Sequence, residues 1–161
     1  MSSVHLFPQI NIDTDIICPA RYLNMMTLEE LAPHAMEPFD PNFCKKVQTG
    51  DVIVAGKNFG CGSSREHAVW ALYGAGIRAV IASSFARIFF RNCINYGLVA
   101  IILEDAPKKF SANDKVELDL KNNRIKNLTS KKEYQIEPLP DFVQKIVEAG
   151  GLLKFAKKIK M

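Results

Sequence analysis

Residues 51–103 decide the fold, and they read DVIVAGKNFGCGSSREHAVWALYGAGIRAVIASSFARIFFRNCINYGLVAIIL. Three short apolar runs alternate with two stretches of helical composition. The runs are Asp51–Ala55, Ala79–Ala82 and Leu98–Leu103, and the helical stretches are Ser64–Tyr73 and Ser84–Asn95. Continuous apolar runs of this length are typical of strands buried on both faces. The order strand, helix, strand, helix, strand predicts a parallel sheet with crossover helices, the second capped by Ser84 and ended by Gly97.

The residues before this unit predict irregular structure. We expect three elements there: a turn at Asp13–Asp15 that runs into a short strand ending at Cys18, a helix over Met26–His34 capped by Thr27, and a loop over Met36–Gln48. The segment between Tyr22 and Phe43 is expected to be a flexible loop that becomes ordered only on binding.

The residues after it predict a hairpin and two helices. The hairpin joins Asp114–Leu120 to Arg124–Leu128 through Asn122-Asn123. A helix capped by Asp141 is expected over Asp141–Glu148, and a short basic helix follows to Lys160. The whole chain, residues 1–161, is predicted to form one α/β domain.

Composition and charge exclude several classes of protein. The chain has 161 residues, of which 48% are hydrophobic and 24% are charged, as in ordinary globular domains. No apolar run approaches the roughly 20 residues of a membrane-spanning helix, and the N-terminus has no signal-peptide pattern, so we expect a cytoplasmic protein. Residues 1–105 carry a net charge of −2 and residues 106–161 one of +6, but the lysines are scattered among acidic neighbours. This pattern indicates a solvated surface rather than a nucleic-acid interface.

The four cysteines show no metal-binding or disulfide pattern. They are Cys18, Cys44, Cys61 and Cys93, and none forms a C-x-x-C pair. Neither a zinc ribbon nor a self-contained iron–sulfur site is expected, and a cytosolic chain is not expected to form a disulfide framework. We predict four reduced and mostly buried thiols.

The turn between the first strand and the first helix predicts an anion site. Gly60 and Gly62 let the backbone turn sharply and approach a ligand, and Ser63, Ser64 and Arg65 add two hydroxyls and a guanidinium. A following helix N-terminus would add unpaired N–H groups and the positive end of a dipole.

The residue pattern leaves several alternatives open here. Ser63 and Glu66 fit a structural S-x-x-E capping box as well as a functional serine. Arg65 opposes the helix dipole and needs an anion, which is Glu66, a distant aspartate or a ligand. A third possibility is a Cys61 thiolate with His67 as its base. Dinucleotide, P-loop and serine-hydrolase motifs do not match the stretch.

Three segments resemble one family. Gly60–Ala68 strongly resembles the G-x-G-S-S-R-E-H-A signature of the swivelling domain of the aconitase superfamily. Asn11–Ile17 resembles the N-x-D-T-D-x-I-I segment of isopropylmalate isomerase small subunits, and Ser84–Phe89 resembles a further segment of this family. The resemblance implies a three-layer β/β/α domain that closes over a larger partner.

The resemblance also implies a reaction, the isomerisation of 2-isopropylmalate and 3-isopropylmalate by dehydration and rehydration in leucine biosynthesis. The large subunit's [4Fe–4S] cluster is the implied Lewis acid for the leaving hydroxyl, and this chain is expected to bind no metal or cofactor itself. Ser63 is the implied catalytic base, and Gly62, Ser64 and Arg65 are the implied carboxylate site.

The substrate preference is expected to depend on Tyr22–Met26. Tricarboxylate-using relatives place an arginine in this loop, whereas Met25 and Met26 offer apolar surface that suits an isopropyl group or that merely packs under the loop. Arg21 is a further candidate ligand for a carboxylate. Methylmalate, dimethylmalate and homoaconitate remain alternative substrates, and a non-catalytic anion-binding module remains an alternative function.

Overall fold

The structure, a computed structural model, describes residues 1–160 and contains one seven-stranded mixed sheet. The strands are β1 (Ser2–Phe7), β2 (Val52–Ala55), β3 (Ala79–Ala82), β4 (Val99–Ile102), β5 (Lys115–Asp119), β6 (Arg124–Asn127) and β7 (Lys132–Gln135). Their order is β4-β3-β2-β1-β5-β6-β7. Strands β1 to β4 are parallel, and β5 to β7 continue from β1 in antiparallel pairing.

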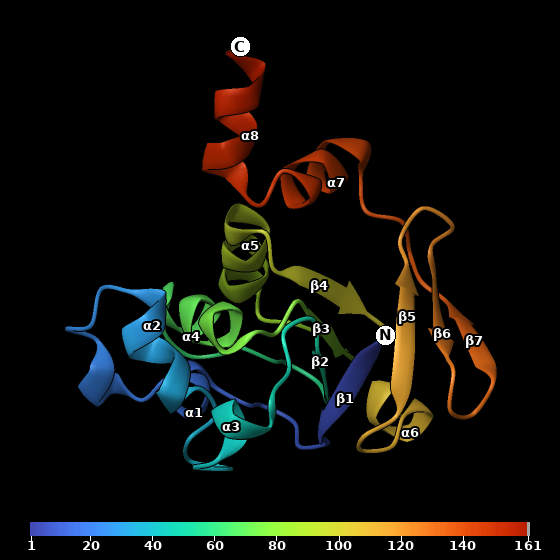
Figure 1. Ribbon diagram of the computed structural model, residues 1–161, viewed down its shortest axis with the longest axis horizontal. Coiled ribbons are helices and arrows are strands. Elements are labelled where there is room, and N and C mark those ends of the chain that lie inside the picture. The colour runs from blue at the N-terminus through green and yellow to red at the C-terminus, as the bar shows by residue number, and fades with distance from the viewer. Residues whose placement is uncertain (161) are drawn as a thin grey trace.

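The helices are short except for the two crossovers and the C-terminal pair. They are α1 (Thr14–Ile17), η1 (Ala20–Tyr22), α2 (Leu28–Leu31), η2 (Ala32–His34), α3 (Phe43–Lys46), α4 (His67–Ala75), α5 (Arg87–Tyr96), α6 (Ala106–Lys109), α7 (Asp141–Glu148) and α8 (Leu152–Ile159). Helices α1 to α5 lie on one side of the parallel strands, β5 to β7 lie on the other, and α8 projects from the body (Figure 1).

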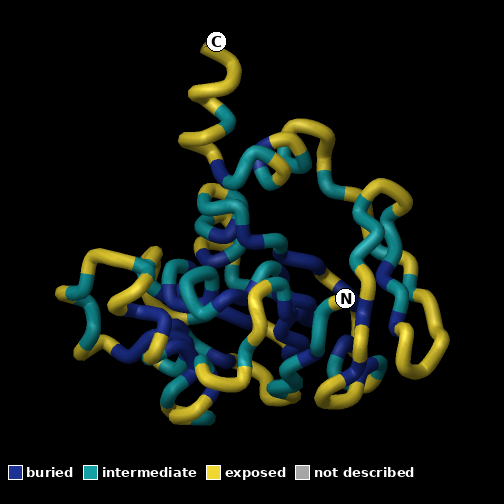
Figure 2. The backbone as a smooth tube through the Cα atoms, viewed as in Figure 1, coloured by how far each residue is buried: buried dark blue, intermediate teal, exposed yellow. Residues whose placement is uncertain are grey.

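Alternate residues of the parallel strands build two cores. Ile53 and Val80 pack under the helices, whereas their neighbours Val54 and Ile81 pack against the β5–β7 layer around Ile125. All four residues of β2 and of β3 are buried, as Figure 2 shows for the centre of the molecule. Strands that carry apolar side chains on both faces separate two layers, so the predicted α/β class with three layers and a central β-α-β-α-β unit is confirmed.

Several predicted elements are confirmed. The three central strands, the hairpin of β5 and β6, and helices α7 and α8 form where the sequence predicted them. Thr27 caps α2, because its hydroxyl accepts a hydrogen bond from the Glu30 N–H at 3.2 Å. Gly97 ends α5 with φ 88°, a conformation that glycine adopts without strain.

Other predictions are wrong. Residues after Asp13 form helix α1 instead of a strand, because the Asp13 carboxylate caps the Ile16 N–H. The predicted loop over Met36–Gln48 contains α3. Ser84 does not cap α5, since its hydroxyl accepts from the Asn58 N–H, and Asp141 lies inside α7 without a capping bond.

Some elements of the fold have no counterpart in the sequence-based predictions. Strands β1 and β7 and helix α6 were not predicted. The segment expected to be flexible folds into α2 and η2 and buries Leu31 and Met36 in the core. Two thiols, Cys18 and Cys93, are buried, whereas the other two are half-exposed, and all four are free. None of the helices within residues 1–160 has the length and apolar character that crossing a membrane requires.

Asp51 gives the fold a pH dependence. Burial alone would raise the pKa of its carboxyl, but hydrogen bonds from the Gln48 N–H, His5 and the Ser3 N–H outweigh burial and hold the pKa below its usual value. A pKa lowered by folding stabilises the protein above the unfolded-state pKa of about 3.9 and ceases to do so as the pH falls through the folded-state pKa.

We therefore expect Asp51→Asn to lower the free energy of unfolding by about 1–3 kcal/mol at pH 7 and to flatten its decline below pH ~4. Urea unfolding at pH 7, 5, 4 and 3 measures both effects, with the exposed Glu117→Gln as control. A wild-type pH profile in the Asp51→Asn variant would contradict this account.

Candidate active site

The three segments that carry the motifs meet at one edge of the sheet. Each follows a parallel strand, and the last residues of these strands, Phe7, Ala55 and Ala82, are in register. Isolated bridges join Asp13 to Cys61 and Phe59 to Phe85. Since the carboxyl ends of parallel strands share an edge, loops far apart in the sequence become neighbours there.

Gly60 makes the close approach of these loops possible. Its φ is +83°, and a Cβ on it would lie 2.1 Å from Cγ of Phe89. Gly62, with φ +104°, leaves room for the Thr14 hydroxyl, which would lie 3.1 Å from an added Cβ. Both positions therefore require glycine, as the sequence predicted for a sharp turn.

The Ser63 hydroxyl accepts hydrogen bonds from two residues. The guanidinium Nε of Arg65 donates to its Oγ, and the Arg65 backbone N–H does so at 3.4 Å. The buried Thr14 hydroxyl donates to the same oxygen at 3.4 Å and accepts the Ser63 backbone N–H at 3.2 Å. Donors that converge on one oxygen are the arrangement that stabilises negative charge developing there.

Arg65 is held by a carboxylate from another segment. Its Nη2 donates to Oδ1 of Asp15 at 2.6 Å, and one quarter of the Arg65 side chain stays exposed. Of the three anions predicted for Arg65, which were Glu66, a distant aspartate and a ligand, the structure shows the distant aspartate, Asp15. A guanidinium fixed on one side by Asp15 keeps further N–H donors for a ligand.

The capping-box alternative is wrong for Ser63. Helix α4 begins at His67, three residues later than the Ser64 start that was predicted, and its first turn has no side-chain cap from Glu66. Ser63 lies before this helix and is exposed together with Gly62 and Ser64. The Ser64 carbonyl accepts a hydrogen bond from the Asn92 side chain at 3.2 Å, which ties the loop to α5.

The Cys61 thiol is not activated. Burial raises its pKa, and the Asp13 carboxylate raises it further, so the thiolate is disfavoured. His67 packs beside the Trp70 ring, with 4.8 Å between ring centroids, and within residues 1–160 its buried Nε2 has no hydrogen-bond partner. This geometry gives no support to a cysteine nucleophile with a histidine base.

The remaining predicted residues lie apart from Ser63, around the turn after η1. Arg21 forms an ion pair with Glu37 at 3.4 Å and keeps 65% of its side chain exposed. Met25 is half-buried and packs against the helical core, whereas Met26 is 71% exposed. Met25 thus has the packing role that the sequence left open, and Met26 presents free apolar surface.

Thr14 and Asp15 are site residues for which the sequence pattern predicted no role. Both belong to the Asn11–Ile17 segment, whose motif is visible in the sequence, whereas the contacts that its side chains make are not. Two backbone bridges between the loops bring these side chains to Ser63 and Arg65. These bridges depend on strand register, which the residue pattern does not show.

The thiols do not form a ligand set for an iron–sulfur cluster. Among residues 1–160 no group of three or more His, Cys, Asp or Glu side chains is placed to hold a metal ion. Burial raises the pKa of Cys18 to about 11 and that of Cys93 further, which disfavours the thiolates that a cluster needs.

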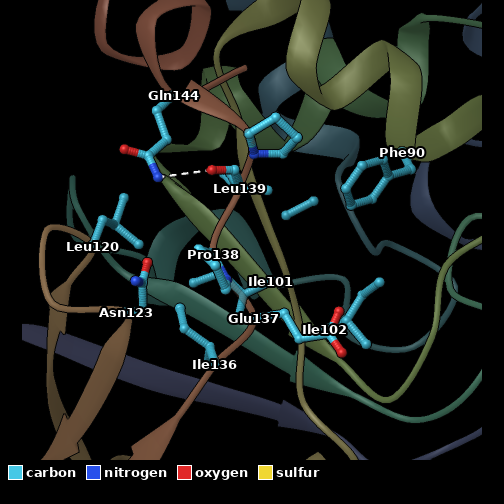
Figure 3. A pocket seen from close by; sticks show the side chains of 12 residues that line it. Phe90, Ile101, Ile102, Leu120, Asn123, Ile136, Glu137, Pro138, Leu139 and Gln144 are labelled. Atoms are coloured by element: carbon cyan, nitrogen blue, oxygen red, sulfur yellow. Dashed lines mark hydrogen bonds between the residues drawn. The ribbon is translucent and has the colours of Figure 1, made fainter. Parts of the chain in front are cut away.

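An apolar cavity of about 200 Å³ lies elsewhere in the fold (Figure 3). It is formed by β4, Phe90 and the segment from Ile136 to Pro140, which the Gln144 side chain holds by donating to the Leu139 carbonyl at 2.9 Å. None of the residues of the Ser63 loop lines it. The Ser63 loop lies outside this cavity, and its residues Gly62, Ser63 and Ser64 are exposed.

The chain is similar in sequence and in fold to proteins of one known family. Residues 7–106 match the aconitase C-terminal domain family. The 3-isopropylmalate dehydratase small subunit of Brachyspira hyodysenteriae is 55% identical over 93% of this chain and 92% of its own, and that of Caldicellulosiruptor bescii is 56% identical over 91% and 89%. The crystal structure of 3-isopropylmalate dehydratase from Methanocaldococcus jannaschii superposes with a TM-score of 0.92, at 47% identity, over 99% of this chain and 93% of that one.

The close approach of Gly60 to Phe89 predicts that adding a single methyl group at position 60 strongly destabilises the fold. Gly60→Ala is expected to lower the free energy of unfolding by about 2–5 kcal/mol, because the Cβ has no space and φ is positive. Gly50→Ala is a matched control, since Gly50 also has a positive φ of +102° but nothing within 4 Å of an added Cβ. Urea denaturation compares the two variants, and equal losses would disprove the steric account.

Proposed function

The chain belongs to the small subunits of 3-isopropylmalate dehydratase, within the aconitase C-terminal domain family, and on that premise we propose that its Ser63 is the catalytic base of a split active site. Members of this family are subunits of a hydro-lyase of leucine biosynthesis. The observation that carries the proposal is the convergence of Arg65 and Thr14 donors on Ser63 Oγ.

The proposed step at Ser63 is a proton transfer. In the dehydration the Ser63 alkoxide takes the proton from the carbon beside a substrate carboxylate, and in the rehydration the hydroxyl returns it to the neighbouring position. A serine hydroxyl is a weak base in water, so the step depends on the guanidinium of Arg65 and the hydroxyl of Thr14 to stabilise the alkoxide. The remaining donors of Arg65, with Ser64 and the backbone at Gly62, hold the carboxylate next to the reacting carbon.

The proposal places the other half of the site on a large subunit. Gly62, Ser63 and Ser64 are exposed here, whereas a proton transfer of this kind needs a site closed to bulk solvent that retains only the water molecule released and added back. We assign the [4Fe–4S] cluster to the large subunit, because the described residues of this chain do not fit it. The chain would act as one swivelling domain in the cytoplasm, where its four free thiols stay reduced.

The substrate proposed is 3-isopropylmalate. Met26 offers exposed apolar surface on the turn before α2, and within Tyr22–Met26 there is no arginine to receive a third carboxylate. Another branched malate would undergo the same chemistry at Ser63, so Ser63 does not distinguish substrates. We assign that discrimination to the contact between the Met26 side chain and the alkyl group of the substrate.

Replacing the base should abolish turnover without weakening binding. In the assembled two-subunit enzyme we expect Ser63→Ala to lower kcat about 10²–10⁴-fold and to change KM by less than about threefold. Turnover of 3-isopropylmalate under anaerobic conditions measures both constants, and neither subunit alone is expected to be active.

Ser130→Ala, in the exposed turn before β7, is the control and should match the wild type. An active Ser63→Ala enzyme would remove Ser63 from the chemistry, whereas an inactive wild-type mixture would reject the proposed substrate.

Met26 tests the substrate assignment. We expect Met26→Ala to raise KM for 3-isopropylmalate about tenfold, because an apolar contact with the isopropyl group is lost, and to leave KM for methylmalate nearly unchanged. Leu153→Ala on α8, another exposed apolar residue, is the matched control. Equal changes for both substrates would show that Met26 does not contact the isopropyl group.

A further inference from the structure

A second polar cluster is built around Glu37. The Tyr22 hydroxyl donates to Oε1 of Glu37 at 3.2 Å, and Oε2 lies 3.4 Å from Nη2 of Arg21 and 3.3 Å from Nδ1 of His34. The Tyr22 ring stacks on the His34 ring with 3.7 Å between centroids, and the Arg21 guanidinium lies 4.8 Å from the centroid of the Tyr22 ring. One carboxylate thus organises three side chains from η1 and η2.

The same cluster fixes one end of the turn that carries Met25 and Met26. The Met25 N–H donates to the Tyr22 carbonyl at 3.0 Å, so the turn starts at the residue that Glu37 holds. The other end is closed by Glu30, whose carboxylate accepts the Met26 N–H at 2.9 Å. The two methionines therefore sit on a short span that is anchored at both ends.

Glu37 is also connected to the segment that supports Ser63. Its neighbour Met36 is buried, and the Met36 N–H donates to the Ile17 carbonyl at 3.0 Å, at the end of α1. Helix α1 is the element that carries the Thr14 hydroxyl and the Asp15 carboxylate. The buried Cys18 ends this helix, where its N–H donates to the Thr14 carbonyl at 2.8 Å.

We propose that Glu37 is a positioning residue for substrate selection, which holds Arg21 and Tyr22 so that the Met25–Met26 turn is presented to the non-reacting end of the substrate. This inference rests on the proposed function, because it assigns Glu37 to the specificity side of the same site. Glu37 would touch neither the substrate nor Ser63.

Fold stability alone does not account for this carboxylate. Oε2 of Glu37 is buried, and within residues 1–160 it has no hydrogen bond of good geometry, only the Arg21 guanidinium at 3.4 Å and the His34 ring at 3.3 Å. An apolar residue at this place would avoid that desolvation cost, whereas orienting a guanidinium and a phenol hydroxyl together needs an acceptor with two oxygens.

The position of the turn should affect binding more than chemistry. Contacts to the non-reacting end of a substrate are made equally in the ground state and the transition state, so losing them raises KM and spares kcat. In the assembled enzyme we expect Glu37→Gln to raise KM for 3-isopropylmalate about three- to tenfold, with kcat within about twofold of the wild type.

Two further variants make the assignment specific. Tyr22→Phe removes the hydroxyl that donates to Glu37 and should shift KM in the same direction, and the double variant should be little worse than either single one. Glu29→Gln on α2 is the control, an exposed glutamate of the neighbouring helix that is expected to leave both constants unchanged. A Glu37→Gln enzyme that loses kcat and keeps KM, or that matches the wild type, would overturn the proposal.

Hydrogen–deuterium exchange of the chain alone tests Glu37 without turnover. We expect amides of residues 22–27 to exchange at least about fivefold faster in Glu37→Gln than in wild type, while residues 60–67 keep their rates. Unchanged exchange at residues 22–27 would overturn the positioning role. If the wild-type mixture fails on 3-isopropylmalate while the exchange changes as expected, the proposed substrate is wrong and the Glu37 anchor stands.

Discussion

The register of the parallel strands β1, β2 and β3 is the constraint on which the site depends. Because Phe7, Ala55 and Ala82 are aligned, the three following loops leave the sheet at one level and pack against one another. Gly60 allows this packing, since any side chain there would collide with Phe89. A shift of register by one residue would turn the buried faces of these strands over and separate Thr14 from Ser63.

Two connected clusters of charged and polar side chains lie near this edge of the sheet. One is the Ser63 cluster, in which Arg65 bridges the hydroxyl and Asp15. The other is built around Glu37, and helix α1 joins the two. In this arrangement the group proposed to move a proton and the turn proposed to select the substrate are held by different side chains, although helix α1 connects them.

Much of the fold was predictable because the central unit is locally consistent. The apolar runs, the helical stretches and Gly97 all indicate the same β-α-β-α-β order. Strand β1 was missed because its Ser2 and His5 break the apolar pattern, although pairing with β2 on one side and β5 on the other holds it in the sheet. Helix α1 was missed because a short helix depends on one cap, the Asp13 carboxylate.

The candidate site was predictable as a set of residues but not as a set of contacts. The motif identified Ser63 and Arg65, whereas the partners Thr14 and Asp15 lie about fifty positions away in the sequence and meet them only through strand register. The capping-box interpretation of Ser63 and Glu66 was wrong for a related reason. The S-x-x-E spacing also occurs in a loop that precedes the helix. Spacing alone does not distinguish a cap from a ligand site.

A structure of the assembled two-subunit enzyme with 3-isopropylmalate bound tests the central claim most directly. The account predicts that Ser63 Oγ lies within about 3.5 Å of the substrate carbon that carries the transferred proton, with Arg65 on the adjacent carboxylate. A substrate bound away from Ser63, with the hydroxyl still hydrogen-bonded only to Arg65 and Thr14, would contradict it.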